Sequence, residues 1–204
     1  MVRLVVFVKA PQAGHVKTRL IPSLGASGAA ALARKLLTHA LRQATAADTD
    51  AVELCMSPAP QDPAWQGMKF GPAVTLASQG DGDLGERMAG AMARVMVQHQ
   101  GPVMLMGTDC PTLTSAHLNE AARQLSKHDA VLLPARDGGY VLIGLKAPCP
   151  ALFNDMPWST PEVAAETLRR MAALSLRVWQ GPTLQDIDEA ADLVHLPPSF
   201  LPSD

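Results

Sequence analysis

The stretch VRLVVFVKAPQAGHVKTRL, residues 2–20, decides the fold class. Its first part, Val2–Val8, is a short run of mostly β-branched residues, which is typical of a strand buried on both faces of a parallel sheet. After a polar loop, Ser27–Ala47 is rich in Ala and Leu, and its leucines recur near helical spacing. The chain therefore opens with a strand, a loop and a helix, the unit from which parallel α/β sheets are built.

The same alternation continues to the end of the chain. Asp83–Gln98 is predicted to be a helix that opens with a capping box, because Glu86 follows three residues after Asp83. The connection Arg136–Gly139 is too short for a parallel crossover, so the strand after it is expected to run antiparallel. Further strands are predicted at Ala51–Met56, Ala73–Ala77, Pro102–Met106, Ala130–Pro134, Tyr140–Leu145 and Leu176–Trp179, and further helices from Thr114 to Ser126, over Glu162–Ala173 and over Ile187–Val194.

Composition narrows the class of protein. The 204 residues are 48% hydrophobic and 18% charged, which is typical of a folded globular chain. A balance of 17 Lys and Arg against 19 Asp and Glu gives a net charge of −2, which argues against a nucleic-acid partner. No boundary, repeat or low-complexity tract is found, so residues 1–204 are predicted to form one domain, with an extended or frayed tail at Pro197–Asp204.

Two features indicate the compartment. The three cysteines, Cys55, Cys110 and Cys149, are widely spaced and form no CxxC pair, which favours a reducing environment over a disulfide framework. The apolar run Leu4–Val8 is too short for a signal-peptide core, and a spanning helix needs about 20 apolar residues. We expect a cytoplasmic protein with no membrane partner.

Ligands of open parallel sheets bind beyond the carboxyl ends of the strands, and three features lie at such ends. The first is the loop after the first strand, which carries Lys9, Gly14, Lys17 and Arg19. It fails the phosphate-loop pattern because Pro11 and Val16 stand where glycines are required. Gly14 still permits a tight backbone, and the cations can neutralise phosphates. The alternative is an ordinary solvated basic loop.

The second feature is Gly107-Thr-Asp109-Cys-Pro111, directly after a buried strand. An aspartate at the end of such a strand suits a hard divalent cation, which binds through one or two carboxylates and substrate phosphate oxygens. The alternative is an Asx turn that leads into the helix beginning near Thr114.

The third feature is the acidic stretch Gln185–Asp192. Asp186 and Asp188 share a face if this segment is extended. If a helix begins at Ile187, one of the two aspartates instead caps it. The residues alone leave both readings open.

A competing pattern is Gly80-Asp-Gly82-Asp-Leu-Gly85, which matches the dinucleotide fingerprint GxGxxG between a strand and a helix. This would make the chain an NAD(P)-dependent oxidoreductase. The carboxylates of Asp81 and Asp83 oppose it, because they would repel a pyrophosphate.

Six motifs occur in order over residues 3–194: VFVKAPQAGHVKTRL, SQGDGDLGERM, MGTDCPTL, RDGGYVLIGL, PWSTPEVAAETLRR and LQDIDEAADL. Together they resemble the DUF2064 family of radical-SAM- and selenodomain-associated transferases, the arsenosugar-biosynthesis type. That family belongs to the nucleotide-diphospho-sugar transferase superfamily of the GT-A type. The resemblance implies a three-layer α/β/α fold with a mostly parallel sheet and one antiparallel strand.

The resemblance also implies roles for individual residues. Asp109 matches the metal-binding aspartate of the superfamily, and Asp188 its second carboxylate, with Mg²⁺ or Mn²⁺ as the cofactor. Glu189 and Ala190 depart from the Thr-Pro of relatives, which leaves the choice between Asp186 and Asp188 open. The implied nucleotide-binding residues are Lys9, Ala10, Pro11, Gly14, Lys17, Arg19, Gln79, Gly85 and Asp109, the catalytic ones are Lys17, Arg19 and Asp109, and the acceptor side is Asp137, Gly139, Tyr140 and Trp158.

The leading hypothesis is therefore a nucleotide-dependent transferase that acts on a small-molecule acceptor. The family name favours a glycosyltransferase with a nucleotide-sugar donor. The absence of a spaced DxD, since residue 107 is Gly, favours a nucleotidyltransferase that uses a nucleoside triphosphate and releases pyrophosphate. A non-catalytic nucleotide-binding partner of another enzyme is a third alternative. The base, the sugar, the acceptor and the oligomeric state are left open.

Overall fold

The computed structural model describes residues 2–200, and these form a seven-stranded sheet in the order β3-β2-β1-β4-β6-β5-β7. β6 runs antiparallel to both of its neighbours, β4 and β5, and the other pairs are parallel. This confirms the mostly parallel sheet and the antiparallel strand after Arg136–Gly139. The strands are β1 (Arg3–Lys9), β2 (Val52–Ser57), β3 (Val74–Ser78), β4 (Val103–Met106), β5 (Ala130–Pro134), β6 (Tyr140–Leu145) and β7 (Val178–Gln180).

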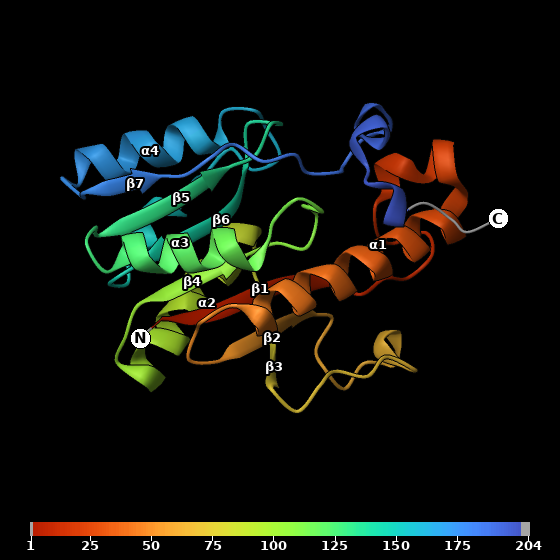
Figure 1. Cartoon of the computed structure of the whole chain (residues 1–204), viewed down its shortest axis with the longest axis horizontal. Coiled ribbons are helices and arrows are strands. Elements are labelled where there is room, and N and C mark those ends of the chain that lie inside the picture. Colours follow the sequence, from red (N-terminus) through yellow and green to blue (C-terminus); the bar gives the residue numbers. More distant parts are fainter. Residues whose placement is uncertain (1, 201–204) are drawn as a thin grey trace.

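Helices cover both faces of this sheet (Figure 1). α1 (Ile21–Ala46) and α3 (Ser115–Leu125) pack against one face in one apolar cluster. α2 (Leu84–His99) and α4 (Val163–Ala173) pack against the other face in a second cluster. The three-layer α/β/α arrangement is thus confirmed. None of the helices within residues 2–200 has both the length and the apolar character that a membrane crossing needs.

Local signals account for the starts of α2 and α3 but not for that of α1. Asp83 accepts a hydrogen bond from the backbone of Glu86 and Glu86 reaches back to Asp83, so the predicted capping box is present. Thr114 caps α3 as expected. α1 begins six residues before the predicted Ser27, and Gly25, with φ of 69°, interrupts its first turns. This early part escaped the pattern because Pro22 and Gly25 look like helix breakers.

The C-terminal segment differs most from the prediction. Instead of a helix over Ile187–Val194, a 3₁₀ helix spans only Ala190–His195. Its N-cap is Glu189, so capping by Asp186 or Asp188 is wrong. The tail is not frayed up to Phe200, which is buried at the end of a 3₁₀ turn, Pro198–Phe200. Residues 201–204 of the predicted tail lie outside the described residues.

A third apolar cluster joins the two ends of the chain. Ile187 and Phe200 from the C-terminal segment pack with Leu20 and with Leu32 and Leu36 of α1. Figure 1 shows this segment, in dark blue, beside the red start of α1. Packing in this cluster holds residues 187–200 against Leu20 and α1. This tertiary packing explains why no regular helix forms over Ile187–Val194.

Candidate active site

The side chain of Lys17 lies between two carboxylates from distant parts of the chain. Its Nζ is 2.8 Å from Oδ1 of Asp109 and 3.0 Å from Oδ1 of Asp188, and it donates a hydrogen bond of 2.5 Å to the backbone oxygen of Ile187. The Lys17 side chain is only 3% exposed, whereas those of Asp109 and Asp188 are 50% and 40% exposed. Each ammonium proton therefore has an acceptor, and both carboxylates remain accessible.

Burial alone lowers the pKa of the Lys17 ammonium, because the charged form loses hydration. The neighbouring charges of Asp109 and Asp188 outweigh this effect, so the net pKa is raised above its ordinary value. Lys17 is consequently a permanent positive charge at neutral pH. A second cation is near: Nη1 of the half-exposed Arg19 is 3.7 Å from Oδ2 of Asp188 and 3.3 Å from Oε1 of Glu189.

The loop after β1 turns Lys17 inward. Gly14 has φ of 83°, a conformation that glycine adopts without steric cost, which confirms the tight backbone expected there. Lys17 itself has φ of 48°, which is uncommon for a residue with a side chain. The next turn, Thr18–Leu20, buries Leu20 in the third apolar cluster. Packing of Leu20 therefore anchors the loop that carries Lys17 and Arg19.

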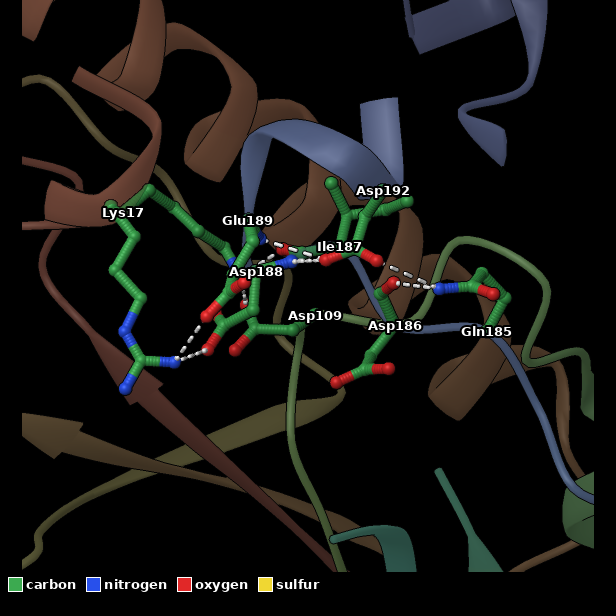
Figure 2. Close-up of polar contacts among 9 residues, drawn as sticks. Lys17, Asp109, Gln185, Asp186, Ile187, Asp188, Glu189 and Asp192 are labelled. Carbon is green, nitrogen blue, oxygen red and sulfur yellow. Dashed lines mark hydrogen bonds and ion pairs between the residues drawn. The ribbon is translucent and has the colours of Figure 1, made fainter. Parts of the chain in front are cut away.

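The segment Gln185–Asp192 crosses the ends of the strands and presents Asp188. Its start pairs with the end of β5 through Leu184, and the backbone N–H of Ile187 donates to the backbone oxygen of Asp109 over 2.9 Å. These contacts bring Asp188 to Asp109, and Figure 2 shows the carboxylate of Asp186 apart from that pair. The register that the sequence left open is thereby resolved in favour of Asp188 as the neighbour of Asp109.

Asp192 holds this segment in shape. Its Oδ2 accepts hydrogen bonds from the backbone N–H of Asp188 at 2.9 Å and of Glu189 at 2.7 Å, and its Oδ1 accepts from Gln185 Nε2 at 3.2 Å (Figure 2). The sequence analysis missed this residue. The spacing of Glu189 and Asp192, which form a capping box, is the signal that could have identified it.

A cavity of about 830 Å³ opens beside the ion-pair cluster. This is within the range of about 300–1,000 Å³ that small-molecule sites occupy. Asp109, Asp188 and Arg19 line it, as do the predicted acceptor residues Asp137, Gly139, Tyr140 and Trp158. The cavity thus joins two groups of residues that the sequence analysis assigned to different halves of one site.

Aromatic side chains form part of this cavity's wall. The rings of Tyr140 and Trp158 meet edge to face, with centroids 6.5 Å apart. Among the described residues, the Tyr140 hydroxyl and Trp158 Nε1 are buried without a hydrogen-bond partner, and burial raises the pKa of Tyr140. The rings, rather than these polar atoms, are therefore what a ligand in the cavity can contact.

Asp186 also lines the cavity, and it lies next to Asp137. Burial, and then the nearby charges of Asp137 and Asp188, raise the pKa of Asp186 to about 7. From the sequence, Asp186 is a candidate metal ligand or helix cap, and its contact with Asp137 is not expected. No local pattern predicts that contact, because the two residues are 49 positions apart in the chain.

The predicted nucleotide-binding residues outside this cluster lie at the ends of β1 and β3. Lys9 ends β1 with an exposed side chain, and the buried Ala10 and Pro11 follow it. Gly85 is in the first turn of α2. Unlike Arg19 and Asp109, none of these four lines the cavity, and Gly14 and Gln79 do not line it either.

Gln79 has a structural set of contacts. Its Nε2 donates to the backbone oxygens of Val8 and Cys55, and its Oε1 accepts from Arg87. The side chain therefore ties β1, β2 and α2 together, and its amide is not free to contact a base. Reading of a base by this side chain, which the resemblance implied, has no support in this geometry.

The GxGxxG loop is closed to a pyrophosphate. Asp83 already occupies the N-terminus of α2 as its cap, with Glu86 reciprocating. A phosphate at that position would face both carboxylates instead of free N–H groups. The geometry thus weighs against the dinucleotide interpretation of Gly80–Gly85.

The carboxylates of Asp109 and Asp188 suit a divalent cation only if a bound substrate completes its coordination. Within residues 2–200, no group of three or more His, Cys, Asp or Glu side chains is placed to hold a metal ion. Asp109 and Asp188 supply two accessible carboxylates that already bind a cation, the Lys17 ammonium. Mg²⁺ is commonly held by one or two carboxylates and completed by substrate phosphates and water, and this pair fits that arrangement.

Known structures share this architecture. A crystal structure of a candidate nucleotide-diphospho-sugar transferase from Desulfovibrio desulfuricans G20 is 34% identical, with a TM-score of 0.86 over 94% of this chain and 84% of that chain. CMP:2-keto-3-deoxy-manno-octonic acid synthetase in complex with CTP is 11% identical, with a TM-score of 0.57 over 95% of both chains. Rv0371C from Mycobacterium tuberculosis H37Rv in complex with manganese is 14% identical, with a TM-score of 0.58 over 95% of this chain and 96% of that chain.

The fold is therefore that of nucleotide-diphospho-sugar transferases and nucleotidyltransferases. Residues 40–160 match the family described as "Uncharacterized protein conserved in bacteria (DUF2064)". The chain belongs to this family, which confirms the resemblance stated from the six motifs. No curated protein matches the chain.

Proposed function

We propose that this chain is a nucleotide-dependent transferase, and within that class a metal-dependent glycosyltransferase that takes a nucleotide-sugar donor. One observation carries the proposal: Lys17, Asp109 and Asp188 meet at the carboxyl ends of the strands, beside a cavity of about 830 Å³. Ligands of open α/β sheets bind at this edge. The family relationship and the similar protein from Desulfovibrio desulfuricans support the same class.

In this proposal the two carboxylates and the two cations act on the diphosphate of the donor. Asp109 and Asp188 would hold Mg²⁺ or Mn²⁺, which when bound supplies positive charge to the diphosphate oxygens. Lys17 and Arg19 neutralise the charge that develops on the diphosphate as its bond to the sugar breaks. Stabilisation of this kind is electrostatic, so the site needs no protein nucleophile.

The remaining predicted residues divide between the two substrates. The first loop binds the nucleotide next to the ion-pair cluster, and the aromatic wall of the cavity and Asp137 hold the acceptor. The nucleotide-binding residues proposed here are Lys9, Ala10, Pro11, Gly14 and Gly85 with Lys17, Arg19 and Asp109, and the acceptor residues are Asp137, Gly139, Tyr140 and Trp158.

A second candidate is a nucleotidyltransferase that acts on a phosphorylated small molecule. The fold likeness to a synthetase in complex with CTP favours it. So does the concentration of cations in the first loop, since a triphosphate carries more negative charge than the diphosphate of a nucleotide-sugar. The two candidates release different products: a nucleoside diphosphate in sugar transfer and pyrophosphate in nucleotidyl transfer.

A thermal-shift panel tests the proposal. Nucleoside triphosphates, nucleoside diphosphates and nucleotide-sugars, each with and without Mg²⁺ or Mn²⁺, are compared with NAD and NADP. We expect metal-dependent stabilisation by one nucleotide-sugar and weaker effects from the dinucleotides. Pyrophosphate release from a triphosphate would favour the second candidate, and stabilisation by NAD or NADP alone would reject both.

Variants of the carboxylates extend this test. Asp109→Asn and Asp188→Asn keep the shape of each side chain but remove its charge, so each should abolish the metal-dependent part of the stabilisation and reduce turnover. Asp48→Asn is the matched control, because Asp48 is an exposed aspartate that precedes β2, at the opposite edge of the sheet. Metal-dependent binding that survives in both site variants would contradict the assignment of the metal site.

A further inference from the structure

The Lys17 ammonium forms ion pairs with the two carboxylates that would hold the proposed metal ion. Its Nζ takes Oδ1 of Asp109 and Oδ1 of Asp188, the two groups assigned to the cation, at 2.8 and 3.0 Å. A cation that bridged the two carboxylates through these Oδ1 atoms would have to enter the space of this ammonium, because metal-oxygen distances for Mg²⁺ are about 2.0–2.1 Å. Two cations held this close would also repel each other strongly in a partly buried site.

We propose that Lys17 is a built-in counter-ion that a divalent metal displaces, and that the released ammonium then binds the phosphates of the nucleotide. This inference rests on the proposed function, because it assumes that Asp109 and Asp188 take the metal. It adds a coupling between the metal and the nucleotide that the function alone does not require. It also gives the Lys17 side chain two positions, one on the carboxylates and one on the substrate.

The surroundings of Lys17 allow this exchange. Two of the three acceptors of its ammonium are the side chains of Asp109 and Asp188, which are half-exposed and reachable from the cavity. The third acceptor, the backbone oxygen of Ile187, is on the same segment as Asp188. Lysine is suited to such a movement, because its compact charge is carried on a flexible stem of four carbons.

Electrostatics favours displacement of the Lys17 ammonium by the metal only when a nucleotide is present. When the metal binds without a nucleotide, the Lys17 ammonium exchanges its two carboxylate partners for water. This exchange is unfavourable, so the metal alone binds weakly. With a diphosphate or triphosphate present, the ammonium gains new anionic partners beside Arg19. Metal and nucleotide should therefore bind cooperatively, and by thermodynamic linkage each should strengthen the other by the same factor.

The first experiment measures Mn²⁺ affinity by paramagnetic resonance in the absence and in the presence of a nucleoside diphosphate. In Lys17→Met, Mn²⁺ alone should bind more tightly by about tenfold or more, because its competitor is gone. The strengthening of Mn²⁺ binding by the nucleotide should shrink in the same variant. For the affinity of Mn²⁺ alone, Arg19→Met is the comparison: it removes an exposed cation whose Nη1 lies 3.7 Å from Oδ2 of Asp188 and which, within residues 2–200, forms no ion pair with Asp109.

The comparison separates competition from simple repulsion. Arg19→Met should change the affinity for Mn²⁺ alone by about threefold at most, as expected for a solvent-screened charge. If Lys17→Met and Arg19→Met have equal effects, Lys17 only adds to the local field, and the proposal is overturned.

The second experiment uses the unaltered protein, so it does not depend on whether Lys17→Met folds. A buried ammonium with three acceptors exchanges its protons slowly, and its ¹⁵Nζ signal can be followed by NMR. Saturating Mg²⁺ with a nucleoside diphosphate should shift or abolish the Lys17 signal. A Lys17 signal that is unchanged at saturation would refute displacement.

Failure of the inference can be distinguished from failure of the function. If Mn²⁺ binds, and binding is lost in Asp109→Asn and Asp188→Asn while the Lys17 signal does not move, then the metal site stands and only the displacement is wrong. If those two variants bind Mn²⁺ as the unaltered protein does, the metal assignment itself is wrong, and the inference falls with it.

Discussion

Asp192 shows how much one side chain contributes to the geometry of this site. Its carboxylate accepts three hydrogen bonds, and these shape the turn that presents Asp188 to Lys17. Its backbone partners, the N–H groups of Asp188 and Glu189, would otherwise lack an acceptor at the start of the 3₁₀ helix. We regard Asp192 as a positioning residue for Asp188.

This role predicts a combined effect of Asp192→Ala. Loss of the three hydrogen bonds should lower the free energy of unfolding by about 1–2 kcal/mol, and metal-dependent nucleotide binding should weaken because Asp188 is no longer held. Urea unfolding and binding titrations measure the two effects. Asp48→Ala, at an exposed aspartate near the opposite edge of the sheet, should change neither. A variant with normal stability and normal binding would contradict the role.

The raised pKa of Asp186 predicts that the stability of the protein depends on pH. Its folded pKa of about 7 lies above the ordinary value of 3.8, because of burial and the nearby charges of Asp137 and Asp188. Between these two pH values the folded state binds more protons than the unfolded state, so this group makes the protein less stable as the pH rises. The effect is present above about pH 7 and absent below about pH 4.

Asp186→Asn should remove this effect, because asparagine does not ionise. Above pH 7 the variant should be more stable than the unaltered protein by about 1 kcal/mol, after allowance for solvent screening of a half-buried group. Near pH 4 the two should be equally stable. Melting temperatures from pH 4 to pH 8, measured with EDTA to remove metals, test this, and parallel pH profiles would contradict it.

At the scale of the elements, the start of α2 packs very closely against the loop before α4. A methyl group on Gly85 would lie 2.4 Å from the backbone oxygen of Phe153 and 2.9 Å from Trp158 Nε1. The first of these contacts is with backbone, which cannot rotate away. Gly85 therefore sets the distance between α2 and the wall of the cavity, besides any role in binding the nucleotide.

Gly85→Ala should destabilise the protein by about 1–3 kcal/mol through overpacking. Gly90→Ala is the matched control on the same helix: nothing lies within 4 Å of its added methyl group, and alanine favours a helix over glycine by up to about 1 kcal/mol. The two substitutions should thus change the denaturation midpoint in opposite directions. Equal midpoints would show that α2 can move away from Phe153.

The whole molecule is organised by one continuous seven-stranded sheet. β1 pairs with β4 in parallel, and this pairing joins the group β1–β3 to the group β4–β7 in one sheet. The third apolar cluster further joins Leu20 near the start to Phe200 near the end. We expect such a chain to unfold as one cooperative unit.

Three tryptophans test this expectation. Trp65 packs in the cluster on one face of the sheet and Trp158 against the cluster on the other, and Trp179 lies on β7 at the edge. Urea transitions followed by tryptophan fluorescence in single-tryptophan variants should coincide with the transition followed by circular dichroism. Separate midpoints would indicate that one part of the chain unfolds independently.

Much of this fold could be predicted because its signals are local. The β-branched run of β1 and the capping box of α2 depend on residues within a few positions of each other, and the short connection before β6 restricts its direction. Part of the site could be predicted from local signals as well. Lys17 and Asp109 follow predicted strands, and parallel strands bring their carboxyl ends to one edge.

The sequence by itself therefore determined the α/β class, the starts of α2 and α3 and the edge of the sheet at which the charged residues collect. Only the tertiary structure decided that Asp188, and not Asp186, meets Asp109, and that Lys17 is buried between them. The reason is physical. Contacts between residues 170 positions apart depend on the packing of Leu20, Ile187 and Phe200, and that packing replaced the locally predicted helix at Ile187–Val194.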